Sequence, residues 1–128
     1  MTTKIHMSVL EILARYAGNF IMTPDIINEM LKTEDARFVL RSLKNRKVAG
    51  IPEDVSDEKL ERFVRDSYRL EVITALSILK SESYLIDMRY GEKKVSGKVL
   101  KLGAKICVGE IGYCITELGV EQSKKLSG

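Results

Sequence analysis

The sequence is poor in the residue types from which metal centres and disulfide frameworks are built. Its 128 residues include one histidine, two cysteines, two prolines and no tryptophan. His6 lies far along the chain from Cys107 and Cys114, so a four-ligand zinc site is not supported. We therefore expect no metal ion and no other cofactor.

The sequence also lacks a phosphate-binding glycine loop. Gly91, Gly97 and Gly103 recur at intervals of six and precede strand-like residues, whereas such a loop must lead into a helix. One histidine without a visible partner cannot form a catalytic triad. We therefore expect that the chain is not an enzyme.

No long apolar run occurs in the chain. Residues 1–6 lack the apolar core of a secretion signal, and no stretch approaches the roughly 20 apolar residues that a membrane span needs. We expect a cytoplasmic protein without a membrane partner. The composition, 45% hydrophobic and 30% charged, is typical of a folded chain.

The first half of the chain has the three- and four-residue apolar spacing of amphipathic helices. This spacing predicts helices over 8–17, 23–31 and 34–48. Thr23 and Thr33 are of the residue type that caps a helix start, and Pro24 suits the first helical turn. The second and third helices, joined by a tight turn, are typical of a helix-turn-helix.

The second half of the chain changes from helix to strand. Ser56 begins a helical pattern that continues to about Ser81, either as one helix or as two helices joined near Ser67. Residues 84–90 alternate with the two-residue period of a strand, and Thr116 can cap a closing helix.

A β-hairpin is expected close to the end of the chain. With a turn at 109–112, Val108 would face Tyr113 and Cys107 would face Cys114. This register would permit a disulfide, although a cytoplasmic setting favours two reduced structural thiols. A redox switch and a stabilising bridge are the alternatives.

The net charge of +3 is small, so only local clusters of charge can argue for a polyanionic partner. Five cations and no acid lie between Arg37 and Lys47. The candidate residues of this basic stripe are Arg37, Arg41, Lys44, Asn45, Arg46 and Lys47. Such side chains contact phosphate oxygens and base edges, which predicts binding to the major groove of duplex DNA.

The alternative interpretation of the basic stripe is a solvated helix face. The DNA hypothesis requires that Arg37, Arg41 and Lys44 share one direction. It also requires that neighbouring carboxylates do not neutralise them.

A second run of five cations without an acid extends from Lys93 to Lys105. Its candidate DNA contacts are Lys93, Lys94, Lys98 and Lys101. Lysine lacks the bidentate fork of arginine, so nonspecific attraction to the phosphate backbone is favoured over base reading. The alternative is a charged edge that discourages sheet-to-sheet aggregation.

Two segments of the second half carry a family resemblance. Gly112-Tyr113-Cys114-Ile115-Thr116-Glu117-Leu118-Gly119 resembles the end of the wing in small prokaryotic, archaeal or viral winged-helix regulators, where the last wing strand leads directly into a helix. Leu76-Ser77-Ile78-Leu79-Lys80 followed by Tyr84-Leu85-Ile86 is similar to the end of their recognition helix and their first wing strand. On that helix the most evident cations are Arg69 and Lys80.

The resemblance implies a mainly α fold with a small antiparallel β wing, which is an α+β winged helix, either alone or as two tandem units. It divides the chain into a helix-turn-helix unit over 1–52 and a winged-helix unit with a C-terminal helix over 53–128, which can form one compact domain. The predicted function is duplex-DNA binding by a homodimer, as a transcriptional regulator or a plasmid or viral control protein. The alternative is a protein-protein adaptor on a winged-helix scaffold.

Overall fold

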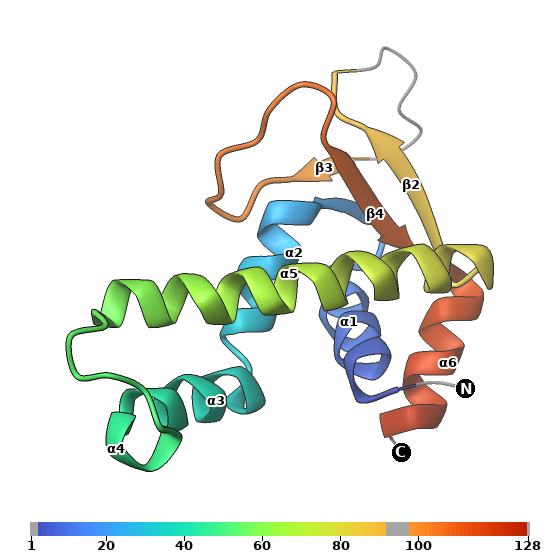
Figure 1. The fold of residues 1–128 in the computed structure, drawn as a ribbon. Helices are drawn as coiled ribbons and strands as arrows, with labels where there is room; N and C mark the ends of the chain where they lie inside the picture. Colours follow the sequence, from blue (N-terminus) through green and yellow to red (C-terminus); the bar gives the residue numbers. More distant parts are fainter. Residues whose placement is uncertain (1–2, 92–97, 128) are drawn as a thin grey trace.

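In the computed structural model, which describes residues 3–91 and 98–127, the chain forms an α+β fold of six helices and a four-stranded sheet (Figure 1). The elements are, in chain order, α1 (Lys4–Arg15), β1 (Asn19–Met22), α2 (Thr23–Leu31), α3 (Glu34–Lys44), α4 (Arg46–Ala49), α5 (Asp57–Ser81), β2 (Leu85–Arg89), β3 (Lys98–Leu100), β4 (Ile111–Ile115) and α6 (Glu117–Ser127). The long helix α5 crosses the molecule, with the sheet on one side of it and α1, α3, α4 and α6 on the other (Figure 1).

The helices predicted for the first half are present, with some of their ends shifted. Thr33 caps α3 as expected, because its side chain accepts a hydrogen bond from the Ala36 N–H at 3.4 Å. The expectation that Thr23 is a cap is wrong, because Thr23 is the first residue of α2 and its hydroxyl donates to the Ile111 carbonyl at 2.6 Å. The predicted helix to residue 48 breaks at Asn45, whose ψ of 70° is not helical.

The helical pattern after Ser56 is one uninterrupted helix of 25 residues, α5. The Ser56 side chain accepts a hydrogen bond from the Lys59 N–H at 3.2 Å and caps its start. The buried side chains of α5 recur along nearly its whole length and are Leu60, Val64, Val72, Ala75, Leu76 and Leu79. This inner face packs against α1, α2 and α3, which explains why the helix does not break near Ser67.

Both halves of the chain contribute to one hydrophobic core. Leu10, Leu13 and Ile26 from the first half are in the same buried cluster as Leu76 and Leu79 from the second, and none of the five is more than 1% exposed. The strand β1 from the first half also lies inside the sheet, between β4 and β3. The segments 1–52 and 53–128 are therefore joined through their core.

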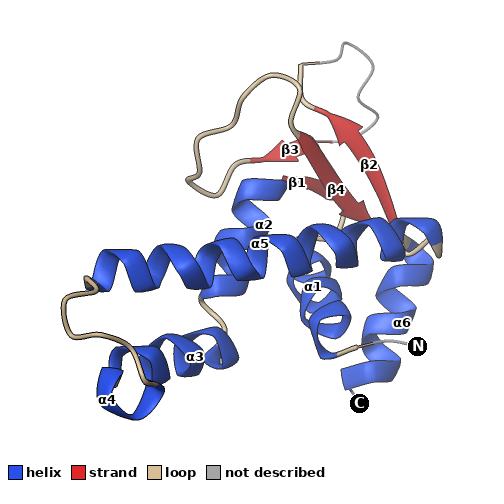
Figure 2. Cartoon of the chain, viewed as in Figure 1, coloured by secondary structure: helices blue, strands red, loops and turns tan. Residues whose placement is uncertain are grey.

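The sheet is mixed, which corrects the expectation of a purely antiparallel one. Its strand order is β2-β4-β1-β3, with β4 antiparallel to both β2 and β1, and β3 parallel to β1 (Figure 2). The connection between β2 and β4 spans residues 90–110, which is long enough to carry β3 past β4 to the far edge of β1. The antiparallel expectation did not include a strand within this connection that pairs parallel with β1.

The predicted pairing of Cys107 with Cys114 is wrong. Residues 105–108 form no strand, and β4 pairs instead with β2, so that Cys114 lies opposite Ile86. The turn before β4 is held by the hydrogen bond from the Gly109 N–H to the Tyr90 carbonyl at 2.9 Å. Cys107 is exposed and Cys114 is buried, both are free thiols, and burial raises the pKa of Cys114.

The junction between β4 and α6 explains two residues of the motif that carried the resemblance. Thr116 caps α6, since its hydroxyl accepts a hydrogen bond from the Gly119 N–H at 3.1 Å and donates one to the Ser83 carbonyl at 2.8 Å. Gly119 lies so close to the Tyr84 carbonyl that an added Cβ would clash with that oxygen. Thr116 and Gly119 thus fix the start of α6 against the turn between α5 and β2.

The substitution Gly119→Ala should destabilise the protein even though it lies within a helix. We expect the free energy of unfolding to fall by about 1–3 kcal/mol from overpacking, despite the roughly 1 kcal/mol by which alanine is the better helix former. Urea unfolding followed by circular dichroism measures this change. The matched control is Glu121→Ala at an exposed site of the same helix, which should leave stability unchanged, and equal stability of the two variants would contradict the assignment.

The connection that follows β3 is held by one buried carboxylate. Asp25 in the first turn of α2 is 1% exposed, and its two oxygens accept hydrogen bonds from the N–H groups of Leu102 and Ala104, each at 2.9 Å. Hydrogen bonds to a charged acceptor are stronger than those between neutral groups. Asp25 therefore fixes the 101–104 segment to the helical layer and, with it, the edge strand β3.

Replacing Asp25 by asparagine should cost about 2–4 kcal/mol of unfolding free energy, because the amide NH2 would face a backbone N–H and leave it unsatisfied. Guanidinium unfolding monitored by circular dichroism gives the value. The control is Asp35→Asn, which removes an exposed ion pair between Asp35 and Lys4 at 2.8 Å and one acid of the first turn of α3, and it should shift the midpoint far less than Asp25→Asn does. A loss for Asp25→Asn no larger than that of the control would show that the carboxylate is not the anchor.

Candidate nucleic-acid interface

The cations of the basic stripe on α3 are largely paired with acids. Arg41 donates to Glu34 at 2.8 Å on the same helix, and Lys44 reaches Glu61 of α5 at 3.3 Å. The hydrogen bond from Arg41, together with its positive charge, lowers the pKa of Glu34. The sequence run contains no acid, but the fold supplies acids to it from outside the run.

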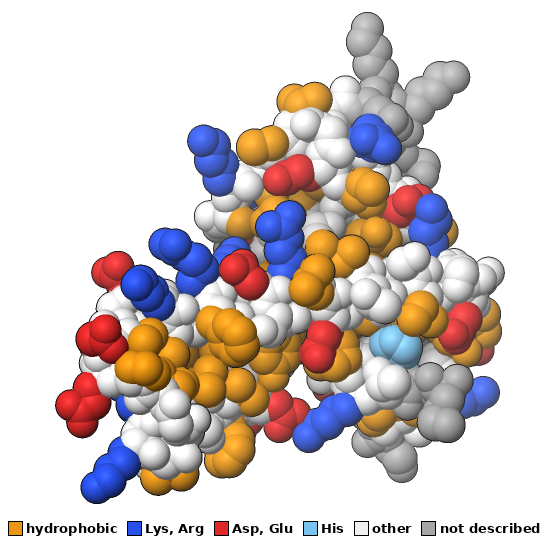
Figure 3. Space-filling view, viewed as in Figure 1, with side chains coloured by type: hydrophobic (Ala, Val, Ile, Leu, Met, Phe, Trp, Pro, Cys, Tyr) orange, Lys and Arg blue, Asp and Glu red, His pale blue; other side chains and the backbone are white. Residues whose placement is uncertain are grey.

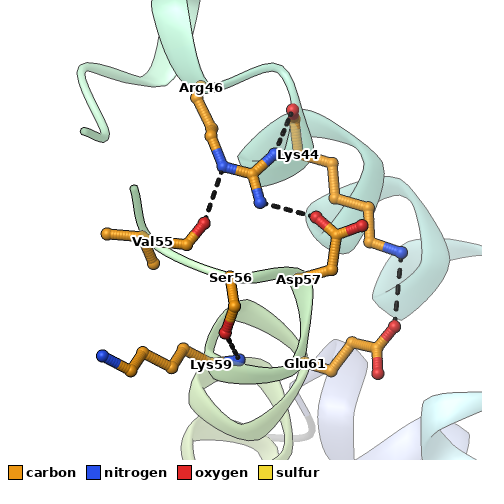
Figure 4. A network of polar contacts seen from close by, with 7 residues as sticks. All are labelled: Lys44, Arg46, Val55, Ser56, Asp57, Lys59 and Glu61. Atoms are coloured by element: carbon orange, nitrogen blue, oxygen red, sulfur yellow. Dashed lines mark hydrogen bonds and ion pairs between the residues drawn. The ribbon is translucent and has the colours of Figure 1, made fainter. Parts of the chain in front are cut away.

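Arg46 holds the turn before α5 rather than facing solvent (Figure 4). Its guanidinium donates to Asp57 at 2.5 Å, to the Val55 carbonyl at 3.0 Å and to the Lys44 carbonyl at 3.4 Å. The side chain is only 21% exposed, and the hydrogen bond from Arg46 lowers the pKa of Asp57. Arg46 therefore has a structural role at the junction of α4 and α5.

The remaining residues of the basic stripe do not share its predicted geometry. Asn45 separates α3 from α4, and Lys47 is exposed on α4 rather than on the same helix as Arg37. Arg37 is exposed and takes part in no ion pair among residues 3–91 and 98–127. Arg41 and Lys44 of the stripe are thus paired with carboxylates, whereas Arg37 forms no ion pair, although its charge also lowers the pKa of the nearby Glu34.

The lysines of the second basic run divide into two groups. Lys93 and Lys94 lie outside the described residues. Lys98 is exposed on the edge strand β3, and the Lys101 ammonium lies 5.3 Å from the centre of the Tyr90 ring, a cation–π distance. Hydrogen bonding to Tyr90 raises the pKa of Lys101, so its charge is held beside the start of the long connection.

The helix α5 carries a row of arginines that was not predicted from the sequence. Arg62, Arg65 and Arg69 follow the i, i+3, i+7 spacing and so share one face of α5, and all three are exposed. In the part of the chain that the structure describes, none of them forms an ion pair or a hydrogen bond through its guanidinium. From the sequence only Arg69 and Lys80 were named as evident cations of this helix, and Lys80 pairs with Asp87 at 2.8 Å.

The arginine row, Arg62, Arg65 and Arg69, borders two surface clefts. Arg62 and Arg65 line a cleft between α3 and α5 together with Arg37. Arg65 and Arg69 line a second cleft, between α5, the first turn of α2 and the residues that lead into β4. Figure 3 shows Lys and Arg side chains along the edge of α5 that faces the connection to β4. The fold thus brings Arg37 of the predicted stripe to the same cleft as Arg62 and Arg65, which were not predicted, and Glu61 also lines this cleft.

Comparisons of the chain with protein-family models, with curated proteins and with solved structures find no match. No helix among the described residues is long and apolar enough to cross a membrane. Within residues 3–91 and 98–127, no group of three or more His, Cys, Asp or Glu side chains could hold a metal ion. Any functional proposal therefore depends on the geometry described above.

The two paired arginines of the basic stripe should differ in their effect on stability. Arg46→Ala removes hydrogen bonds to two carbonyls and to Asp57, and we expect a loss of about 1–3 kcal/mol of unfolding free energy. Arg41→Ala removes one exposed ion pair and should be indistinguishable from the parent protein. Thermal unfolding measured by differential scanning calorimetry compares the two variants, and equal melting temperatures would disprove the structural role of Arg46.

Proposed function

We propose that the chain binds duplex DNA through the arginine row of α5, as a transcriptional regulator or a plasmid or viral control protein. The observation that carries the proposal is the set of three guanidiniums, Arg62, Arg65 and Arg69, on one exposed helix face without carboxylate partners in the described structure. Uncompensated arginines on a rigid helix attract phosphate and release its counterions on binding. They also carry the bidentate donors that read guanine in the major groove.

The dimensions of α5 suit this role. At 1.5 Å per residue its 25 residues extend for about 37 Å, and Arg62 to Arg69 cover about 10 Å, or two helical turns. The major groove of B-DNA is about 12 Å wide and admits one α-helix. The packing of the inner face of α5 against α1 and α2 would hold the guanidiniums at fixed spacing, so that little side-chain and backbone entropy is lost on binding.

The order of the elements supports a winged-helix interpretation of this site. α5 is followed by β2, and β2 pairs antiparallel with β4 as the two arms of a wing would. β4 leads after Thr116 into α6, as the family resemblance implies. In this interpretation α5, rather than α3, is the recognition helix, and β3 is an addition at the sheet edge. Lys98 and Lys101 would then lie on the wing side of the contact surface.

An adaptor function is the second candidate, and one observation favours it. Phe38 of α3 is 63% exposed and Val48 of α4 is 82% exposed, and Figure 3 shows hydrophobic side chains over this part of the molecule. Contiguous exposed apolar surface is a feature of protein–protein contact sites. The arginine experiment below separates the two functions, because an adaptor would capture its partner without the arginine row.

The proposal is tested with the triple variant Arg62→Ala/Arg65→Ala/Arg69→Ala. Fluorescence anisotropy with duplexes of about 25 base pairs, drawn from genomic fragments, gives the affinity across a series of salt concentrations. The slope of log K against log salt should become shallower by about 0.9 for each phosphate that the variant no longer neutralises. We expect the affinity at low salt to fall by at least tenfold, a loss of about 1.4 kcal/mol.

The matched control is Arg41→Ala/Lys44→Ala on α3. These cations are already paired with Glu34 and Glu61, so their removal should change the affinity by less than threefold. If the parent protein binds no duplex at low salt, the proposal is rejected. It is also rejected if the α3 variant loses as much affinity as the α5 variant.

A further inference from the structure

The cleft between α3 and α5 has an apolar lining. α3 lies alongside the first half of α5, as Figure 1 shows, and the cleft between them has a volume of about 410 Å³. Its apolar residues are Leu31, Ala36, Leu40 and Val64. Two of these side chains are buried and the two leucines are half-buried, so packing holds the lining in place.

Three arginines give the same cleft an excess of positive charge. Arg37, Arg62 and Arg65 all line it, and none of them forms an ion pair within the segments that the structure describes. Glu61, an acid that also lines the cleft, is paired with Lys44 at 3.3 Å. The Lys44 ammonium offsets the charge of Glu61, so this carboxylate does not neutralise the arginines.

Other acids near these arginines do not bind them. The pKa of Glu34 is lowered mainly by its hydrogen bond from Arg41 at 2.8 Å, and to a lesser extent by the charge of Arg37. Glu58 and Asp66 of α5 form no ion pair with any residue that the structure describes. The guanidiniums of the cleft therefore keep their donors for an external anion.

We propose that this cleft binds a small organic acid, with its carboxylate at the three guanidiniums and its hydrocarbon body against the apolar lining. Arginine matches the two oxygens of a carboxylate with two parallel hydrogen bonds. Placing the hydrocarbon body against the lining removes apolar surface from water, which favours binding. The volume of the cleft lies within the range of about 300–1,000 Å³ that is typical of small-molecule sites.

Each part of the cleft disfavours a simpler ligand. An inorganic anion such as phosphate would engage the arginines but would leave Leu31 and Leu40 facing water. A neutral apolar molecule would cover the leucines, but it would separate the guanidiniums from water without offering them an acceptor, which is costly. A ligand with both an anionic head and an apolar body satisfies the two parts at once.

Two arginines of the cleft, Arg62 and Arg65, also belong to the arginine row of α5. A carboxylate bound to them would occupy donors that the proposed DNA contact needs, so the organic acid and the duplex should compete. By thermodynamic linkage, each ligand then weakens the binding of the other by the same factor. This competition rests on the proposed function, whereas the binding of the acid does not.

A series of ligands tests the two parts of the site. Isothermal titration calorimetry at pH 7 compares octanoate and 1-naphthoate with acetate, which lacks the apolar body, and with octanol, which lacks the charge. We expect both large acids to bind with dissociation constants at least tenfold lower than those of acetate and octanol. The site is rejected if octanol binds as tightly as octanoate, or if neither large acid binds at about 10 mM.

Two variants of the arginine row locate the bound acid. Arg62→Gln removes a guanidinium of the cleft and should raise the dissociation constant of octanoate at least fivefold. The matched control is Arg69→Gln on the same helix, which removes an equally exposed guanidinium that does not line this cleft and should leave the constant unchanged. Circular dichroism confirms that both variants are folded. Equal constants for the two variants would place the acid elsewhere and overturn the inference.

The competition is measured by repeating the DNA anisotropy titration with saturating octanoate, and with acetate at the same ionic strength as the control. We expect octanoate alone to raise the dissociation constant of the duplex at least threefold. Octanoate that binds without changing this constant would overturn the competition. A protein that binds octanoate but no duplex would refute only the proposed function, and one that binds duplex but neither large acid would refute only this inference.

Discussion

The burial of one face of α5 is the constraint on which the rest of the structure depends. Val72, Leu76 and Leu79 are no more than 1% exposed and pack in the same core as residues of α1 and α2. Once this face is buried, the rotation of the helix is fixed, and every other residue of α5 has a determined direction. The arginine row is a consequence of that rotation, since its direction is defined by its angle to the buried face.

A few specific hydrogen bonds hold the long connection between β2 and β4 against the rest of the fold. Asp25 holds the 101–104 segment by two backbone N–H groups, and Tyr90 holds the turn before β4 through backbone hydrogen bonds to Gly109 and Glu110. These contacts let β3 add to β1 as a parallel edge strand. A single buried carboxylate thus links the first turn of α2 to two backbone N–H groups that lie 77 and 79 residues further along the chain.

Local patterns predicted most of the helices and none of the long-range pairing. The caps at Thr33, Ser56 and Thr116 could be recognised because each acts on its own helix within three residues. The partner of β4 could not be recognised, because residues 105–108 and β2 both offered apolar residues, and only the tertiary structure selects between them. The i, i+3 spacing of Arg62 and Arg65 was visible in the sequence, whereas the place of Arg69 on the same face depends on α5 being continuous through Ser67.

The charges of α3 and α5 differ in whether the fold itself accounts for them. The start of a helix favours acids and its end favours cations, because of the helix dipole. Asp57 at the start of α5 and Lys44 at the end of α3 satisfy this preference, and their elements lie side by side, so that Lys44 pairs with Glu61 and Arg46 with Asp57. Helix electrostatics and these ion pairs therefore account for Lys44 and Arg46 of the basic run without a ligand. Arg62, Arg65 and Arg69 begin beyond the first turn of α5, where the dipole has little effect, and no acid in the described structure pairs with them. An arginine row without ion-pair partners on a rigid helix leaves its guanidinium donors available to an anionic partner, which is why the contact surface is sought on α5.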